Sequence, residues 1–270
     1  MSGHERSGEI PRLFDVDAAA GKPGSDNANA AEEELRPRVR TMRICGCLAG
    51  CSPEGFPRWL NHPEVDLVEW RMDKFADSYS IEEMNSFLGA LSGKPRLPVI
   101  ATNRPVREMG AFAGREDVRL RMLEDAAKSG ADWIDLEHDA CIDMIAPLRE
   151  AGAKVLISWH SPAETPGRKI LRAKLESMCK PGADALKIVT MAQSDEDNLR
   201  VLELIPLAGK ELGVDLIAFC MGSAGGWSRP VSLFLGSPWT YAQLEGQSET
   251  APGQLSVSEM RELIRRFARM

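Results

Sequence analysis

Short apolar runs recur along the chain and alternate with stretches in which apolar residues have helical spacing. The eight runs cover residues 41–48, 65–71, 97–102, 132–137, 154–159, 183–188, 214–219 and 231–235. The helical stretches cover 81–91, 117–129, 142–151, 169–179, 196–212 and 256–270, the last opening with the capping-box spacing of Ser256 and Glu259. Strands that alternate with helices pair in parallel, because a parallel neighbour needs a long crossover connection.

Eight such units predict a (β/α)8 barrel, the TIM-barrel fold, as one domain over residues 41–270. A doubly wound open sheet is the alternative, but no glycine-rich phosphate loop follows the first run. Residues 1–40 are rich in Gly, Ala, Ser, Asn and charged residues, so we expect a disordered N-terminal extension that buries too little apolar surface to become ordered. In the barrel, reactive side chains should gather at the carboxyl ends of the strands.

The composition of the 270-residue chain excludes several classes of protein. A net charge of -7 argues against a general nucleic-acid binder, and no run of about 18 apolar residues could form a membrane-spanning helix. Six cysteines without a disulfide framework suit reduced thiols in the cytoplasm. The cluster of Cys45, Cys47 and Cys51 has neither a paired CxxC nor a nearby histidine, so buried small side chains are favoured over a metal site. We therefore expect a cytoplasmic protein that acts on a small molecule and binds neither nucleic acid nor membrane.

Lys187 interrupts the apolar run at 183–188. A buried ammonium is costly, so proteins tolerate one mainly where the amine is paired or used chemically. A typical use is attack on a ketone or aldehyde to form a Schiff base. Ala185 shares a face with Lys187 and leaves room for a carbonyl substrate. The competing interpretation is an edge-strand lysine whose ammonium reaches water.

Two other runs end in reactive side chains. His160 ends the fifth run and shares a face with Ser158, which suits proton transfer near neutral pH; a structural histidine is the alternative. Glu69 and Arg71 share a face of the second run. They either enter the barrel mouth or satisfy each other as an ion pair.

Polar residues also mark other strand ends and loops. Arg104 and Glu108 lie in the loop after the third run, where solvated charges are the alternative interpretation, and the fourth run ends in Asp135 and Glu137 on one face. A glycine-rich loop after the seventh run leads from Met221 to Arg229, whose guanidinium suits a carboxylate. Before the last helix, a turn with Pro and Gly contains Thr250 and Gln254.

In this order and spacing, the motifs resemble those of type I 3-dehydroquinate dehydratases, the Schiff-base-forming enzymes of the shikimate pathway. The resemblance rests on residues 66–73, 104–110, 135–137, 158–160, 184–187, 221–229, 234–237 and 251–254, and extends over 42–270. It implies a (β/α)8 barrel, usually a homodimer, that converts 3-dehydroquinate to 3-dehydroshikimate and water. It also implies that the reaction needs neither metal nor coenzyme and serves aromatic amino acid biosynthesis.

The resemblance also implies roles for individual residues. By position, Lys187 is similar to the imine-forming lysine, His160 to the general acid and base, and Glu108 to the carboxylate that assists the histidine. The substrate-binding residues that it implies are Glu69, Arg71, Arg104, Arg229, Thr250, Gln254 and Met221. An iminium at C3 acidifies the C2 proton, which His160 removes before the enamine expels the C1 hydroxyl. We expect neighbouring cations to keep part of Lys187 unprotonated.

Two positions depart from the family pattern, and two other functions stay open. Ser161 follows His160 where Asp is usual, and Met109 follows Glu108 where Gly is common, so both loops are expected to change geometry. A class I Schiff-base aldolase predicts a backbone phosphate site after the seventh and eighth strands, whereas this chain offers side chains such as Arg229. A non-catalytic barrel that acts as a binding module is disfavoured by the intact lysine, histidine and glutamate.

Overall fold

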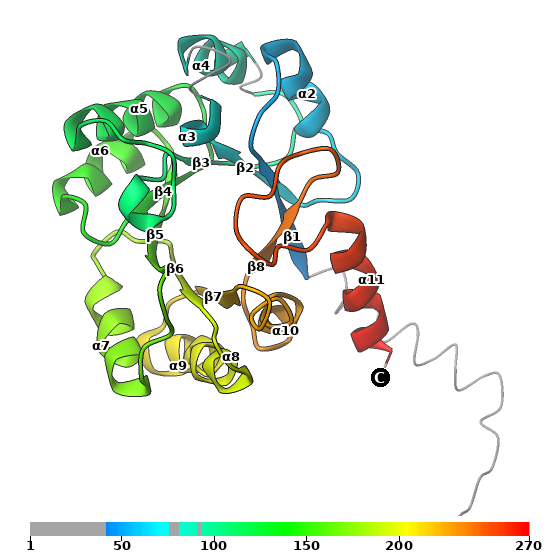
Figure 1. The fold of residues 1–270 in the computed structure, drawn as a ribbon. Coiled ribbons are helices and arrows are strands. Elements are labelled where there is room, and N and C mark those ends of the chain that lie inside the picture. Colours follow the sequence, from blue (N-terminus) through cyan, green and yellow to red (C-terminus); the bar gives the residue numbers. More distant parts are fainter. Residues whose placement is uncertain (1–41, 76–80, 91–92, 270) are drawn as a thin grey trace, which may run out of the picture.

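The computed structural model describes residues 42–75, 81–90 and 93–269, so the extension predicted for residues 1–40 lies outside the described residues. The chain forms the predicted (β/α)8 barrel, with eight parallel strands inside a layer of helices (Figure 1). The strands are β1 (Arg43–Leu48), β2 (Leu67–Arg71), β3 (Val99–Thr102), β4 (Trp133–Glu137), β5 (Lys154–Ser161), β6 (Ala185–Met191), β7 (Leu216–Met221) and β8 (Trp239–Gln243).

The connections between the strands contain α-helices and short turns. The α-helices are α2 (Phe56–Trp59), α3 (Met72–Phe75), α4 (Ile81–Ala90), α5 (Glu116–Lys128), α6 (Ile145–Glu150), α7 (Arg168–Met178), α8 (Asp195–Leu202), α9 (Leu204–Leu207), α10 (Ser228–Phe234) and α11 (Val257–Ala268). The turns are η1 (Pro53–Gly55), η2 (Val106–Glu108), η3 (Ile142–Met144) and the π-helical η4 (Ala208–Leu212). The predicted capping box is present at the start of α11, where the Ser256 hydroxyl accepts from the backbone N–H of Glu259 at 3.2 Å.

The prediction of the eighth strand is wrong. Residues 231–235 lie in and just after α10, and the eighth strand is β8. Five apolar residues do not distinguish a strand from a buried helical turn by periodicity. Pro230 fits the first turn of a helix, whereas Trp239, Thr240 and Tyr241 are aromatic or β-branched residues that favour strands. The helix predicted over 196–212 is also divided, and Pro206 in α9 removes one backbone donor from it.

The strands follow sequence order around the barrel, and β1 pairs with β8. Within the described residues, no hydrogen-bonded strand pairing joins β7 to β8, so the barrel is nearly closed and has one seam. Helix α10 packs against both of these strands. At the carboxyl ends of the strands, the backbone N–H of Gly222 after β7 donates to the carbonyl of Pro252 after β8 at 3.0 Å.

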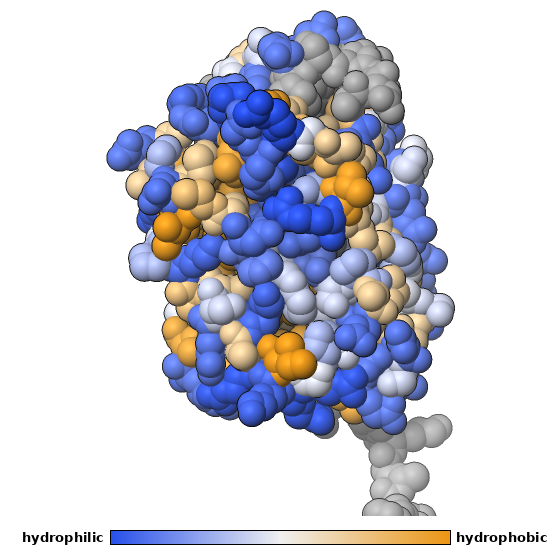
Figure 2. Space-filling model, turned by 60° about the vertical axis from the view of Figure 1, so that its left-hand side comes forward, coloured by the Kyte–Doolittle hydropathy of each residue, from blue (hydrophilic) through white to orange (hydrophobic). Residues whose placement is uncertain are grey.

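Two apolar clusters stabilise the barrel. The larger one lies between the strands and the helices, and the smaller one fills the interior of the barrel. Cys45 and Cys47 belong to the interior cluster as buried small side chains, and all six cysteines are free, as expected from their spacing. No helix among the described residues is long and apolar enough to cross a membrane. On the face shown in Figure 2, apolar residues are scattered over a mainly hydrophilic surface.

Candidate active site

A pocket of about 480 Å³, including its open mouth, lies at the carboxyl ends of the strands. The structure brings all ten residues predicted for the site into its lining: Glu69, Arg71, Arg104, Glu108, His160, Lys187, Met221, Arg229, Thr250 and Gln254. Six further residues, which were not predicted from the sequence to belong to the site, also line the pocket: Cys47, Met109, Val189, Phe219, Tyr241 and Ala251.

Lys187 lies in β6, which pairs with β5 on one side and β7 on the other, and its side chain is 6% exposed. The edge-strand alternative is therefore wrong. Its Nζ atom is 3.2 Å from Asp135 Oδ2 and 3.5 Å from Glu69 Oε1, and 4.1 Å from the ring centroid of Tyr241. The direct neighbours of the amine are thus carboxylates and an aromatic face. A cation is also close, because Arg104 donates to the same Oδ2 atom of Asp135 at 2.5 Å.

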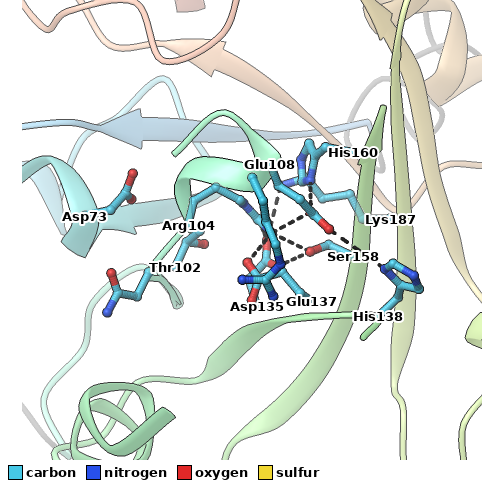
Figure 3. Close-up of polar contacts among 12 residues, drawn as sticks. Asp73, Thr102, Arg104, Glu108, Asp135, Glu137, His138, Ser158, His160 and Lys187 are labelled. Carbon is cyan, nitrogen blue, oxygen red and sulfur yellow. Dashed lines mark hydrogen bonds and ion pairs between the residues drawn. The ribbon is translucent and has the colours of Figure 1, made fainter. Parts of the chain in front are cut away.

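His160 lies beside Lys187 on the adjacent strand, because Ser158 pairs with Lys187 and His160 is two residues further along β5. Its Nδ1 atom is 2.8 Å from Glu108 Oε2 (Figure 3). A carboxylate at this distance accepts a hydrogen bond and therefore holds the imidazole proton on Nδ1, which leaves Nε2 free to accept a proton. Burial, together with the charge of Arg104, lowers the pKa of His160 to about 4, so the free enzyme holds a neutral imidazole at pH 7.

Glu108 lies in the η2 turn after β3 and is buried between His160 and His138 (Figure 3). Glu108 Oε1 and His138 Nδ1 are 3.8 Å apart, which is too long for a hydrogen bond. Burial alone would raise the pKa of Glu108, but the two histidines and Arg104 lower it to about 2. An ionised carboxylate thus supports a neutral imidazole, and it would stabilise the imidazolium formed after proton transfer.

Arg104 directs its guanidinium into a set of buried acceptors. It donates to Asp135 at 2.5 Å and to Glu137 and Ser158 at 2.7 Å each, and it lies 3.6 Å from Glu108. Although burial opposes ionisation, Arg104 and Lys187 hold the pKa of Asp135 well below its usual range. Arg104 therefore positions the acidic groups of the site, and its contact with the substrate, implied by the resemblance, stays a prediction.

Arg119 extends this network outward and was missed by the sequence analysis. It is fully buried in α5, forms an ion pair with Glu137, and donates to the backbone carbonyl of Asn103 at 3.2 Å. In the sequence, Glu116 and Arg119 read as an ordinary pair on a solvated helix face, and this pair is present at 2.6 Å. No local signal distinguishes Arg119 from an exposed arginine.

Arg71 and Glu69 do not satisfy each other as an ion pair. Arg71 instead forms a bidentate pair with Asp73, with contacts of 2.9 and 2.7 Å. Glu69 contacts Lys187 and accepts a hydrogen bond from the Thr102 hydroxyl at 3.0 Å. Both side chains face the pocket, as the alternation along β2 predicted.

Arg229 is buried, and none of the described residues forms a salt bridge with it. Its side chain lies in the first turn of α10, its exposure is 1%, and its guanidinium stacks over Phe219 at 4.4 Å from the ring centroid. In the part of the chain that the structure describes, no salt bridge to Arg229 occurs, and Nε and Nη2 have no hydrogen-bond partner. Burial lowers the pKa of Arg229 to about 10. A buried cation that faces a pocket in this way is suited to an anionic ligand.

Thr250 and Gln254 form the neutral polar wall of the pocket. The backbone N–H and the hydroxyl of Thr250 both donate to Gln254 Oε1, at 3.0 and 2.9 Å. This fixes the orientation of the amide, whose Nε2 donates to Cys47 Sγ at 3.1 Å. Burial and the charge of Glu69 raise the pKa of Cys47 to about 12, so its thiol remains protonated at neutral pH.

Among the described residues, one group has the geometry to hold a metal ion. The ligand atoms of Glu108, His138 and Asp139 lie within 4.8 Å of one another. Both carboxylates already have partners, since Glu108 is bonded to His160 and Asp139 pairs with Arg107 at 2.9 Å. The contacts of both carboxylates with other side chains therefore explain this arrangement without a metal ion.

Known proteins share this chain's sequence and fold. The family model described as Type I 3-dehydroquinase matches residues 44–268. A 3-dehydroquinate dehydratase of Syntrophobacter fumaroxidans is 46% identical over 221 residues, which cover 82% of this chain and 94% of the relative. A second, of Desulfotalea psychrophila, is 35% identical over 234 residues, covering 85% of this chain and all of the relative. The crystal structure of a type I 3-dehydroquinate dehydratase from Clostridium difficile is similar with a TM-score of 0.74 and 26% identity, covering 84% of this chain and 92% of that chain.

Proposed function

Since the chain belongs to the type I 3-dehydroquinase family and is a 3-dehydroquinate dehydratase of the shikimate pathway, we propose that Lys187 forms an imine with the substrate ketone and His160 transfers the protons. The enzyme is a hydro-lyase that removes water from 3-dehydroquinate to give 3-dehydroshikimate. This assignment replaces the aldolase and the non-catalytic barrel considered from the sequence. The observation that carries the proposed roles is the position of Lys187 beside His160, which is bonded to ionised Glu108.

Substrate binding begins with the carboxylate of 3-dehydroquinate. Arg229 offers unpartnered guanidinium donors inside the pocket, so it is the residue best able to pair with this group. Arg71, Thr250 and Gln254 line the same pocket and bind the ring hydroxyls. This fixes the C3 ketone relative to Lys187, which lowers the entropic cost of the chemical step.

Imine formation joins Lys187 to C3 of the substrate. The unprotonated amine adds to the ketone, and the resulting carbinolamine loses water to give an iminium cation. Asp135 and Glu69 lie 3.2 and 3.5 Å from Nζ and stabilise that positive charge. The cation acts as an electron sink, because it accepts the electron pair released when the adjacent C2–H bond breaks.

Elimination then requires a base and an acid. Neutral His160 removes the C2 proton through Nε2, which gives an enamine and an imidazolium stabilised by Glu108. The enamine expels the C1 hydroxyl as water when His160 returns the proton. Addition of water to the iminium releases the product enone and restores Lys187, so one molecule of water leaves in the net reaction.

Borohydride trapping separates the proposed roles of Lys187 and His160. Incubation with 3-dehydroquinate and borohydride should reduce the iminium to a stable adduct that peptide mass mapping places on Lys187, while the conjugated product absorbs in the ultraviolet. Lys187→Ala should lose adduct and turnover together. His160→Ala should still trap the adduct but turn over very slowly. Loss of the adduct in His160→Ala as complete as in Lys187→Ala would refute this division of roles.

We also propose that residues 41–270 form a single catalytic domain and that the enzyme is a cytoplasmic homodimer, as the resemblance implies. Six free cysteines support a reducing compartment. The exposed side chains of Ile142 (47%) and Ile170 (60%) are apolar groups that a subunit contact would cover. Light scattering after size-exclusion chromatography tests the dimer, because a subunit of 29.7 kDa should elute at twice that mass.

A further inference from the structure

Met109 has a backbone conformation that its side chain disfavours. Its φ angle is 63°, and it is the only non-glycine residue in the described ranges with a positive φ. In this left-handed region the Cβ atom of an L-residue crowds the following carbonyl oxygen. Such a conformation persists where the surrounding structure determines it, and it occurs preferentially at functional sites.

The loop that contains Met109 is fixed by its own backbone. The N–H of Phe112 donates to the carbonyl of Arg104, and the N–H of Val106 donates to the carbonyl of Phe112, both at 3.1 Å. Within the turn, the N–H groups of Met109 and Gly110 donate at 3.1 and 3.0 Å. A Cβ atom on Gly110 would lie 1.8 Å from the carbonyl oxygen of Arg104, so the loop closes very tightly.

Ion pairs at its start and a hydrogen bond near its end hold the same loop to the barrel. Arg104 at its start is bonded to Asp135 and Glu137 of β4. Near its end, the N–H of Ala111 donates at 3.0 Å to Asp73, the carboxylate that pairs with Arg71. The loop is therefore a rigid wall of the pocket, and the left-handed residue lies within it.

This rigid loop contributes the apolar side chain of Met109 to a pocket that is also lined by charged residues such as Glu108 and Arg104. Met109 lines the pocket, is partly buried, and packs against the interior cluster of the barrel. The preceding residue, Glu108, holds His160, which in the proposed mechanism removes the C2 proton. Met109 and His160 therefore line the same pocket, and the residue that supplies the thioether directly follows the residue that holds the base.

We propose that Met109 is a specificity-determining residue that narrows the pocket at the C2 edge and excludes substrates with a substituent there. This inference rests on the proposed function of Lys187 and His160. The natural substrate carries only hydrogen atoms at C2, so it fits beside the thioether. A methyl group at C2 would overlap with the wall, and the fixed loop cannot move away to accept it.

The test compares 3-dehydroquinate with its 2-methyl derivative in the wild-type enzyme and in Met109→Ala, Met109→Gly and Met109→Leu. The wild-type enzyme should prefer the natural substrate in kcat/KM by about 100-fold, the order of discrimination that one methyl group gives in a tight pocket. Both the alanine and the glycine variant should reduce this preference by about 10-fold or more. Met109→Leu keeps the volume of the wall and should stay within about threefold of the wild-type preference.

Comparison of the alanine and glycine variants separates the effect of the Met109 side chain from the effect of its strained backbone. Both lose the wall, but only glycine relieves the left-handed conformation, so Met109→Gly should have a higher melting temperature than Met109→Ala. A wild-type preference that both small variants retain would overturn the inference, provided that the wild-type enzyme still forms the borohydride adduct with 3-dehydroquinate. A wild-type enzyme that forms no adduct at Lys187 would instead overturn the proposed function, and this inference with it.

Discussion

Replacing Arg229 with methionine should stabilise the free protein and at the same time weaken substrate binding. Arg229 is 1% exposed, and its guanidinium has neither a salt bridge in the described residues nor a hydrogen bond at Nε or Nη2. Methionine has a similar apolar length and can retain the contact with Phe219. The substitution therefore removes an uncompensated buried charge without opening a large cavity.

The structure gives the size of both effects. Burial lowers the pKa of Arg229 from its ordinary value to about 10, and a difference of this size corresponds to roughly 3 kcal/mol of cost to the folded state. Because the folded pKa is the lower one, the full cost applies below pH about 10, and therefore at pH 7. Loss of the partner of a buried carboxylate should cost about 2–5 kcal/mol of binding, or roughly 30- to 5,000-fold in kcat/KM.

Denaturant unfolding at pH 7 and steady-state kinetics measure these two effects independently. Arg229→Met should unfold at a higher denaturant concentration than the wild-type enzyme and show a strongly reduced kcat/KM for 3-dehydroquinate. Arg229→Lys is the matched control, because it keeps the charge but loses the planar fork, and it should gain no stability. A methionine variant that is less stable than wild type and retains its kcat/KM would refute the reasoning.

Two further predictions concern groups that act on His160 and Lys187. Glu108→Gln should lower kcat by about 10- to 100-fold, because the amide cannot stabilise the imidazolium. The pKa of His160 is about 4, and without Glu108 it would be lower still, because the carboxylate favours the imidazolium. The acid limb of the pH profile of kcat/KM should therefore move to lower pH in this variant. A move to higher pH would contradict the role of the carboxylate. Tyr241→Leu removes the ring that lies 4.1 Å from Lys187 Nζ. If the ring stabilises the iminium cation on Lys187 by about 2 kcal/mol, the amount of trapped adduct should fall roughly 30-fold in the leucine variant. Tyr241→Phe keeps the ring face and should trap normally; an equal loss in both variants would assign the effect to the hydroxyl.

The arrangement of the site was predictable where strand periodicity determines it. Alternation along β2 sends Glu69 and Arg71 into the pocket, and consecutive strands bring His160 next to Lys187. Each of these inferences needs only the side-chain period of two and the rule that barrel sites lie at strand carboxyl ends. The motif order then identifies the loops that supply Glu108 and Arg229.

Contacts between distant segments were beyond the sequence. Nothing local shows that Arg104 is held by Asp135, 31 residues away, or that Tyr241 lies against Lys187. The same limit explains why Arg119 was missed. The position of β8 failed for a different reason, because residues 231–235 are apolar enough for either a strand or a helix.

The seam between β7 and β8 lies where the proposed substrate contacts would connect the two strands. In the described residues, no ladder hydrogen bond joins these two strands, and the connection at their carboxyl ends is made by contacts such as the hydrogen bond between Gly222 and Pro252. Arg229 follows β7 and Gln254 follows β8, so in the proposed mechanism the substrate contacts residues on both sides of the seam. A substrate bound by both residues would therefore link β7 and β8, the two neighbouring strands that no backbone pairing joins in the described residues.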